Sequence, residues 1–159
     1  MYAPNAGSGQ RSMLVGIHNP ELVERLGKLN VAMMRRDNLI GGHVSAEQPS
    51  IIDDPTLKSG FYGAPSVVVV FAQDHFLYSI PDAFCCAENM VLAATELGIA
   101  SCIVARAEET FNNEYGRQLM REWNVPDNYV PRCFVLLGYH RGEYPAVKPR
   151  RDGRTRIIE

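Results

Sequence analysis

The chain has 159 residues, of which 46% are hydrophobic and 21% are charged, and its formal net charge is -2. This length suits one domain with a core of its own, and the near-neutral charge argues against a nucleic-acid-binding surface or a disordered acidic chain. The sequence has no apolar run of about 20 residues that could span a bilayer and no secretory pattern at its start, so we expect a cytoplasmic protein without a membrane partner.

The first ten residues, MYAPNAGSGQ, combine turn formers with small polar side chains and show no apolar period. A loop of this kind exposes backbone donors, which suits the close approach of a planar polar ligand. Taken alone, the segment is equally typical of an ordinary loop.

A helix is predicted to begin at Asn19, because a proline and then an acid follow this N-cap residue. Its apolar face recurs at helical spacing and consists of Leu22, Leu26, Leu29 and Met33. From Asp37 to Gly63 the period disappears among Gly, Pro, Asp and Ser residues. Such long excursions are uncommon in compact domains unless they are functional or contain a short helix.

Ser66 to Ala72, SVVVVFA, is a β-branched run that predicts a strand buried on both faces. The next segment, DAFCCAENMVLAATELG, predicts a helix capped by Asp82 and stopped by Gly98. Because this helix is apolar on most sides, we expect it to be buried all round and to pack in part against a second subunit.

The last third of the chain continues the alternation of strands and helices. Ile99 to Val104 predicts a strand, and Ala107 to Trp123 predicts one amphipathic helix with its acids early and its arginines late. The inner face of this helix is expected to hold Phe111, Tyr115, Leu119 and Trp123. Pro126 to Asn128 predicts a turn, Cys133 to Leu137 a buried strand, and the remainder an extended basic tail. The pattern predicts an α/β or α+β sandwich.

The sequence contains no nucleophile elbow, no zinc-protease motif, no P-loop and no dinucleotide-binding glycine motif. No metal site is expected, because the cysteines lack ligand spacing; they are predicted to be reduced core thiols and are Cys85, Cys86, Cys102 and Cys133. The histidines are scattered and are expected on the surface or in loops: His18, His43, His75 and His140. No side chain is predicted to act as a catalytic group, so a bound cofactor would carry any reaction.

Two further stretches, considered together with the opening loop, are candidates for ligand binding. Ser101 to Arg106 offers backbone groups at the end of a strand, and Lys148-Pro149-Arg150 presents two cations in a stiff segment that suits a phosphate. Each stretch alone is also typical of a core strand or a solvated tail.

Several motifs in order resemble one family. They are A-P-N-A-G-S-G-Q, G-A-P-S-V-V-V-V-F, D-A-F-C-C-A-E-N-M-V-L-A-A-T-E-L-G-I-A-S-C, L-G-Y-H and K-P-R. Together they are similar to the nitroreductase family of FMN-dependent oxidoreductases, and the resemblance covers nearly the whole chain. Its most specific part is the alanine-rich helix followed at the right distance by L-G-Y and K-P-R.

The resemblance implies a single FMN-binding domain over residues 1–159, with an α+β fold in which helices flank a mostly antiparallel sheet. It also implies an obligate homodimer with one FMN in each of two clefts at the subunit interface. The implied reaction is ping-pong: NAD(P)H reduces the flavin at N5, and a small-molecule acceptor such as a nitroaromatic or a quinone then takes the electrons.

Site residues are implied by position in the family. Asn5, Ala6 and Gly7 would lie along the flavin ring and ribityl chain, with Gln10 nearby. The stretch Ile103, Val104 and Ala105 would cover one flavin face and offer a backbone N–H to N5. The phosphate ligands would be Lys148 and Arg150.

The sequence departs from the family in one respect that leaves alternatives open. Family members usually carry a helix and an Arg-x-Ser-x-Arg-type stretch before the loop, and this phosphate-holding stretch is absent here. Besides the oxidoreductase, the alternatives are a non-catalytic or flavin-deficient dimer and a sequence that begins too late. Ala105 and Arg106 also stand where many members have a glycine.

Overall fold

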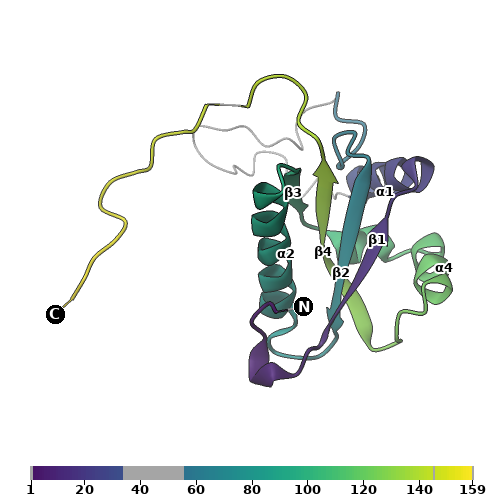
Figure 1. Cartoon of the computed structure of the whole chain (residues 1–159). Coiled ribbons are helices and arrows are strands. Elements are labelled where there is room, and N and C mark those ends of the chain that lie inside the picture. The colour runs from purple at the N-terminus through teal and green to yellow at the C-terminus, as the bar shows by residue number, and fades with distance from the viewer. Residues whose placement is uncertain (1, 34–55, 145, 159) are drawn as a thin grey trace.

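The computed structural model describes residues 2–33, 56–144 and 146–158 (Figure 1). Their strands are β1 (Ser12–Ile17), β2 (Ser66–Gln73), β3 (Ala100–Val104) and β4 (Tyr129–Gly138). These strands form one sheet in the order β1-β2-β4-β3, and every neighbouring pair is antiparallel. The predicted antiparallel sheet flanked by helices is thus confirmed.

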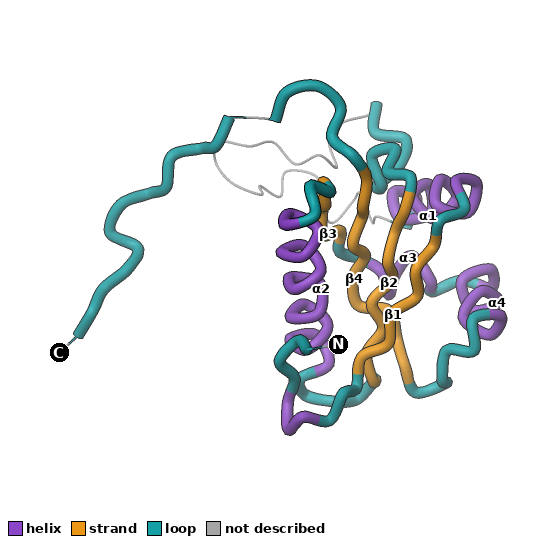
Figure 2. Tube along the Cα trace, in the orientation of Figure 1, coloured by secondary structure: helices purple, strands orange, loops and turns teal. Residues whose placement is uncertain are grey.

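Helices cover both faces of the sheet (Figure 2). Helix α2 (Ser79–Glu96) packs on one face. The opposite face carries α1 (Pro20–Ala32), α3 (Ala107–Phe111) and α4 (Glu114–Glu122). A short 3₁₀ turn, η1 (Ala6–Ser8), precedes β1. Within the described ranges, no helix has the length and apolar character needed to cross a membrane.

Strand β2 is buried on both faces, as its β-branched run predicts. Val67, Val69 and Phe71 belong to the core beneath α1, α3 and α4. Val70 and Ala72 belong to the core beneath α2. Because side chains alternate along a strand, a run of apolar residues can serve two cores at once.

Strand β1 has no counterpart in the sequence predictions. Its residues, SMLVGI, include Ser12 and Gly16, which weaken both the apolar alternation and the strand propensity. It pairs with β2 from Ser12 opposite Ala72 to Ile17 opposite Val67. Pairing with β2, which lies far along the chain, therefore stabilises this segment as a strand.

The predicted start of α1 is confirmed, because the Asn19 side chain accepts a hydrogen bond from the N–H of Leu22 at 3.0 Å. Helix α2 begins at Ser79, so the prediction that Asp82 caps it is wrong. Pro81 fits inside the first turn, where helical N–H groups have no intrahelical partner. Gly98 adopts a φ of 68° just after the helix, as its predicted role as a stop requires.

The single helix predicted from Ala107 to Trp123 is wrong, because the chain breaks into α3 and α4. The Asn113 side chain accepts the N–H of Gly116 at 2.9 Å and so starts a new helix. A Cβ on Gly116 would lie 2.4 Å from the Phe111 carbonyl oxygen, so only glycine allows this close approach. The predicted inner face nevertheless packs on the core, with Phe111 and Leu119 buried.

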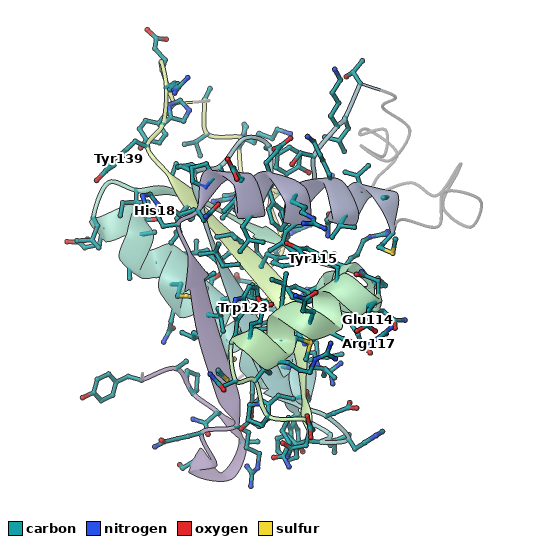
Figure 3. All side chains as sticks on the ribbon, turned by 90° about the vertical axis from the view of Figure 1, so that its right-hand side faces the viewer. His18, Glu114, Tyr115, Arg117, Trp123 and Tyr139 are labelled. Carbon is teal, nitrogen blue, oxygen red and sulfur yellow. The ribbon has the colours of Figure 1, made fainter. Side chains whose placement is uncertain are left out.

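The two sides of α4 carry different kinds of side chain, as Figure 3 shows: Tyr115 faces α1, and Glu114 and Arg117 lie on the exposed side. Tyr115 lies between α1 and α4, and the Arg25 guanidinium stacks over its ring at 3.5 Å from the centroid. Glu114 pairs with Arg117 at 3.4 Å on the exposed side. The helix therefore has the amphipathic character that its sequence predicts.

Strand β4 begins at Tyr129, earlier than the predicted Cys133, because a bulge carries the pairing past Pro131. Arg132 occupies this bulge and is 11% exposed. Its guanidinium donates to Glu108 at 2.7 Å, Ser79 at 2.9 Å and Asp74 at 3.2 Å. These bonds tie β4 to α3, to the start of α2 and to the end of β2. The predicted turn before the strand is confirmed by the bond from Tyr129 N–H to Pro126.

The predicted excursion from Asp37 to Gly63 lies largely outside the described residues. Its described end contributes to the core, because Phe61 is 1% exposed and meets Phe134 edge-on at 4.8 Å between ring centroids. After β4, the described tail has no helix or strand and runs away from the sheet, in agreement with the predicted extended tail (Figure 1).

Replacing Phe134 by alanine tests the core on the α1 side. The side chain is fully buried and its ring contacts Phe61 and Phe111, so its loss leaves a cavity. We expect the free energy of unfolding to fall by about 3–5 kcal/mol in urea titrations at fixed protein concentration. Leu77→Ala, at an 83% exposed position, is the control and should change it by less than about 0.5 kcal/mol. Equal losses in both variants would contradict this description of the core.

Candidate functional site

Side-chain hydrogen bonds hold the N-terminal loop against α2 and join parts of the loop to one another. The Ala6 N–H donates to both carboxylate oxygens of Asp82, at 3.0 and 3.2 Å. The Ala6 carbonyl accepts from Arg11 at 3.2 Å, and the Asn5 side-chain oxygen accepts the Gln10 N–H at 2.8 Å. These bonds impose one shape on a segment that the sequence alone leaves as a loop.

This loop borders a cavity of about 200 Å³. Its lining consists of Ala3, Asn5, Gln10, Ser12 and Cys86. The Ser12 hydroxyl oxygen is buried and has no hydrogen-bond partner in the described part of the chain. A buried hydroxyl without a partner is costly, so the cavity suits a polar ligand. Two residues predicted to contact the flavin, Asn5 and Gln10, thus share one cavity, and Ala6 and Gly7 lie between them in the chain.

The second predicted segment, Ile103 to Ala105, lies at the β3 edge of the sheet. Beyond the strand, the Ala105 carbonyl accepts from the Asn30 amide at 3.2 Å. The Arg106 carbonyl accepts from the Thr110 hydroxyl at 2.6 Å, and Asn30 also donates to this hydroxyl at 3.0 Å. Asn30 and Thr110 are both buried, so a small polar cluster fixes the backbone of this segment.

Arg106 adopts a φ of 67°, the left-handed region that favours glycine. Arg106 belongs to the Ala105-Arg106 pair that the resemblance places where many family members would have a glycine. The chain therefore keeps a glycine-like backbone conformation with an arginine, and the bond from Thr110 helps to hold it.

The third predicted element, Lys148 and Arg150, is exposed on the tail that leaves the sheet (Figure 1). Strands β2 and β4 separate β1 from β3, which places the two edges about 14 Å apart at ordinary strand spacing. One subunit consequently brings together Asn5, Ala6, Gly7 and Gln10 but not Ile103, Val104 and Ala105, nor the two tail cations. The roles of these residues toward a flavin stay predictions.

A larger cavity of about 830 Å³ lies beside the start of β3 and the end of β4. Its lining includes Ser101 and Cys102 but none of the residues predicted to contact the flavin or its phosphate. Tyr62 and Cys102 face it. Although residue Cys102 is exposed as a whole, partial burial of its thiol raises the pKa of that group. Partial burial, followed by the charge of Cys102, raises the pKa of the Tyr62 phenol. Both shifts favour the neutral form near pH 7, so neither Tyr62 nor Cys102 is activated as a nucleophile.

The cysteines differ in burial, and the expectation of four core thiols needs correction. Cys86 and Cys133 are buried, and burial, followed by the influence of Cys86, raises the pKa of Cys133 to about 12. Cys85 is half-buried, whereas Cys102, in the edge strand β3, is exposed. All four are free thiols.

The described histidines lie outside the helices and strands, as the prediction of surface or loop positions requires. His18 bonds Ser66 at 2.6 Å, His140 bonds the Gly142 carbonyl at 3.1 Å, and His75 is exposed. His43 lies outside the described residues.

Sequence reasoning missed the side chains that hold the candidate segments, above all Asp82, Arg11 and Asn30. Asp82 stood out only as a helix cap, and Asn30 lies within an otherwise ordinary amphipathic helix. A buried position on the apolar face of a helix is unusual for an asparagine, and this was the one available signal.

Comparison with known proteins agrees with this architecture. The nitroreductase family matches residues 1–139, so the chain belongs to that family. A nitroreductase with bound FMN from Bacteroides fragilis superposes with a TM-score of 0.73 and 26% identity, over 99% of this chain and 81% of that one. No curated protein sequence matches the chain.

Two structures with lower sequence identity also share the fold. A nitroreductase with bound FMN from Desulfitobacterium hafniense has a TM-score of 0.75 at 24% identity, over 98% of this chain and 80% of that one. An iodotyrosine deiodinase bound to FMN and 3-iodo-L-tyrosine has a TM-score of 0.59 at 16% identity, over 97% of this chain and 82% of that one.

Replacing Thr110 by valine tests the buried cluster behind Ala105. The change keeps the shape of the side chain but removes the hydroxyl that meets Arg106 and Asn30, so we expect a loss of about 1–3 kcal/mol in the free energy of unfolding. The matched control is Thr95→Val, because the Thr95 hydroxyl makes the same type of bond, to Val91 at 2.9 Å, on the exposed side of α2. Thermal and urea unfolding measure both; an unchanged Thr110→Val protein would contradict the role given to the cluster.

Proposed function

We propose that this protein is an FMN-dependent oxidoreductase acting in the cytoplasm as a single FMN-binding domain over residues 1–159. Its electron donor would be NAD(P)H, and its acceptor a nitroaromatic, a quinone or a similar small molecule. The observation that carries the proposal is membership of the nitroreductase family, together with the FMN-bound Bacteroides fragilis nitroreductase that aligns with 99% of this chain.

The residues present fit such a cofactor. Asn5, Gln10 and the unpartnered hydroxyl of Ser12 supply hydrogen-bonding groups around one cavity. No atom of the described residues lies within 4 Å of the position of a Cβ on Gly7, so a flat ligand can approach the backbone there. Lys148 and Arg150 supply the positive charge that a phosphate requires.

FMN, when bound, would supply the hydride-accepting and hydride-donating chemistry of the reaction. The chain itself would bind and orient it. Asn5 and Gln10 would hydrogen-bond its polar edge, and the backbone from Ile103 to Ala105 would cover one face and exclude water. No side chain needs to act as a general base in this scheme.

We further propose that the site is completed by a second copy of the chain. The loop with Asn5 and the segment ending at Ala105 lie at opposite edges of one sheet, so a second subunit could bring one of each together. Helix α2 supports this idea, because its outer side leaves apolar side chains exposed over about a third of its circumference: Ile80, Phe84 and Leu92.

The alternative is a dimer of the same fold that binds flavin poorly or does not catalyse. The cavity of about 200 Å³ favours it, because ligand pockets commonly measure about 300–1,000 Å³. In the first hypothesis a second subunit completes the cavity so that it can hold FMN. In the alternative the dimer forms without completing it.

An absorbance spectrum of the purified protein tests the proposed function. An FMN-dependent enzyme should be yellow, or become so with added FMN, and NADH or NADPH should bleach it under anaerobic conditions. A protein that takes up no FMN would overturn the proposal and support the alternative. An acceptor screen with nitroaromatics and quinones would then define the substrate class of an active protein.

Replacing Lys148 or Arg150 by alanine should weaken FMN binding at least about tenfold in each case, because each change removes one charge-assisted phosphate contact. Titration with FMN, followed by the quenching of its fluorescence, measures the effect. Arg154→Ala is the control, since it removes an exposed cation of the same tail without touching the predicted pair. Equal losses in all three variants would indicate a general charge effect and contradict specific phosphate ligands.

Leu92→Lys tests the proposed dimer. Leu92 is 59% exposed in the subunit, and a lysine on an apolar interface would leave a buried charge unpaired. Sedimentation velocity should show a dimer for the original protein and a shift toward monomer for the variant. The control is Gln118→Lys, because Gln118 is an exposed residue of α4 on the opposite face of the sheet from α2. This variant should leave the dimer intact. A monomeric original protein would contradict the proposal.

A further inference from the structure

Asp82 is a buried carboxylate with an unusual partner. It is 5% exposed and lies in the first turn of α2. Both of its oxygens face one backbone N–H, that of Ala6, which lies 76 positions earlier in the chain. In the described part of the chain, no ion pair involves this carboxylate, so its hydrogen bond to the loop is its principal compensation for burial.

The loop needs such a restraint. Gly7, Ser8 and Gln10 all adopt positive φ values, of 58°, 51° and 50°. This conformation is unfavourable for Ser8 and Gln10, which carry a Cβ, and it persists only where surrounding bonds impose it. Asp82 holds the N–H of Ala6 and Arg11 holds its carbonyl, so the residue just before the strained turn is fixed on both sides.

Asp82 also stands next to the cavity described above. Cys86, which lines that cavity with Asn5 and Gln10, lies one helical turn after Asp82 on the same side of α2. The hydrogen bond between Asp82 and Ala6 therefore fixes the distance between the loop and α2 at the edge of the cavity.

We propose that Asp82 is a positioning residue for flavin binding: its carboxylate fixes the Ala6 peptide and so keeps Asn5 and Gln10 aimed into the cavity. This inference rests on the proposed function, since it assumes that the loop contacts FMN. The essential feature is a hydrogen-bond acceptor at this place. The charge itself is favoured by the start of α2, where the helix dipole is positive.

Two substitutions separate the acceptor from the charge. Asp82→Ala removes the acceptor, and we expect FMN affinity to fall about tenfold or more, because a hydrogen bond to a charged group is lost. Asp82→Asn keeps an oxygen that can accept the Ala6 N–H, and its affinity should stay within about threefold of the original. Leu119→Ala, a buried core change on the opposite face of the sheet, controls for general loss of stability and should leave FMN affinity unchanged.

Amide hydrogen exchange gives a readout that does not depend on flavin. Without added FMN, peptides covering residues 5–10 should exchange faster in Asp82→Ala than in the original protein or in Asp82→Asn, while those of β2 stay protected. Unchanged exchange in Asp82→Ala, or FMN affinity equal to that of the original protein, would overturn the inference, as would an equal loss of affinity in Leu119→Ala. An original protein that binds no FMN while its loop exchange still responds to Asp82→Ala would instead overturn the proposed function.

Discussion

The structure depends on the burial of β2 and β4 between two layers of helices. Each of these central strands sends alternate side chains into a different core, so Val69 and Phe134 pack beneath α1 and α3 while Val70 and Cys133 pack beneath α2. Removing apolar surface from water on both faces is the largest stabilising contribution that a strand can make. Among the described helices, this burial places only α2 on one face, and in the described sheet β1 and β3 are the edge strands.

The candidate site follows from this arrangement, because both of its backbone segments adjoin an edge strand. Buried polar side chains hold the loop before β1 and the segment after β3. Asp82 holds one through Ala6, and Asn30 holds the other through Ala105. Helices on opposite faces of the sheet thus position the two segments that we propose face a flavin. Their separation across the sheet is the physical reason for proposing that a second subunit completes the site.

Much of the fold could be predicted from local sequence. The valine run of β2, the cap at Asn19 and the glycine after α2 are strong local signals, and the structure agrees with each. The failures share a cause. Strand β1 has weak propensity and exists because β2 pairs with it, and β4 begins early because a bulge at Arg132 accommodates Pro131. The break before α4 depends on the contact of Gly116 with the Phe111 backbone, which the helical period of the sequence does not reveal.

The sequence by itself determined the class of protein and the residue types from which a flavin site could be built, because motif order and side-chain chemistry are carried by the chain. Only the tertiary structure decided which of those residues meet. Asn5 and Gln10 share a cavity with Ser12 and Cys86, whereas Ile103 to Ala105 lie at the other edge. The pairing of strands and the hydrogen bond from Ala6 to Asp82 connect segments that are far apart in the chain. The local periodicity of the sequence does not predict such long-range contacts.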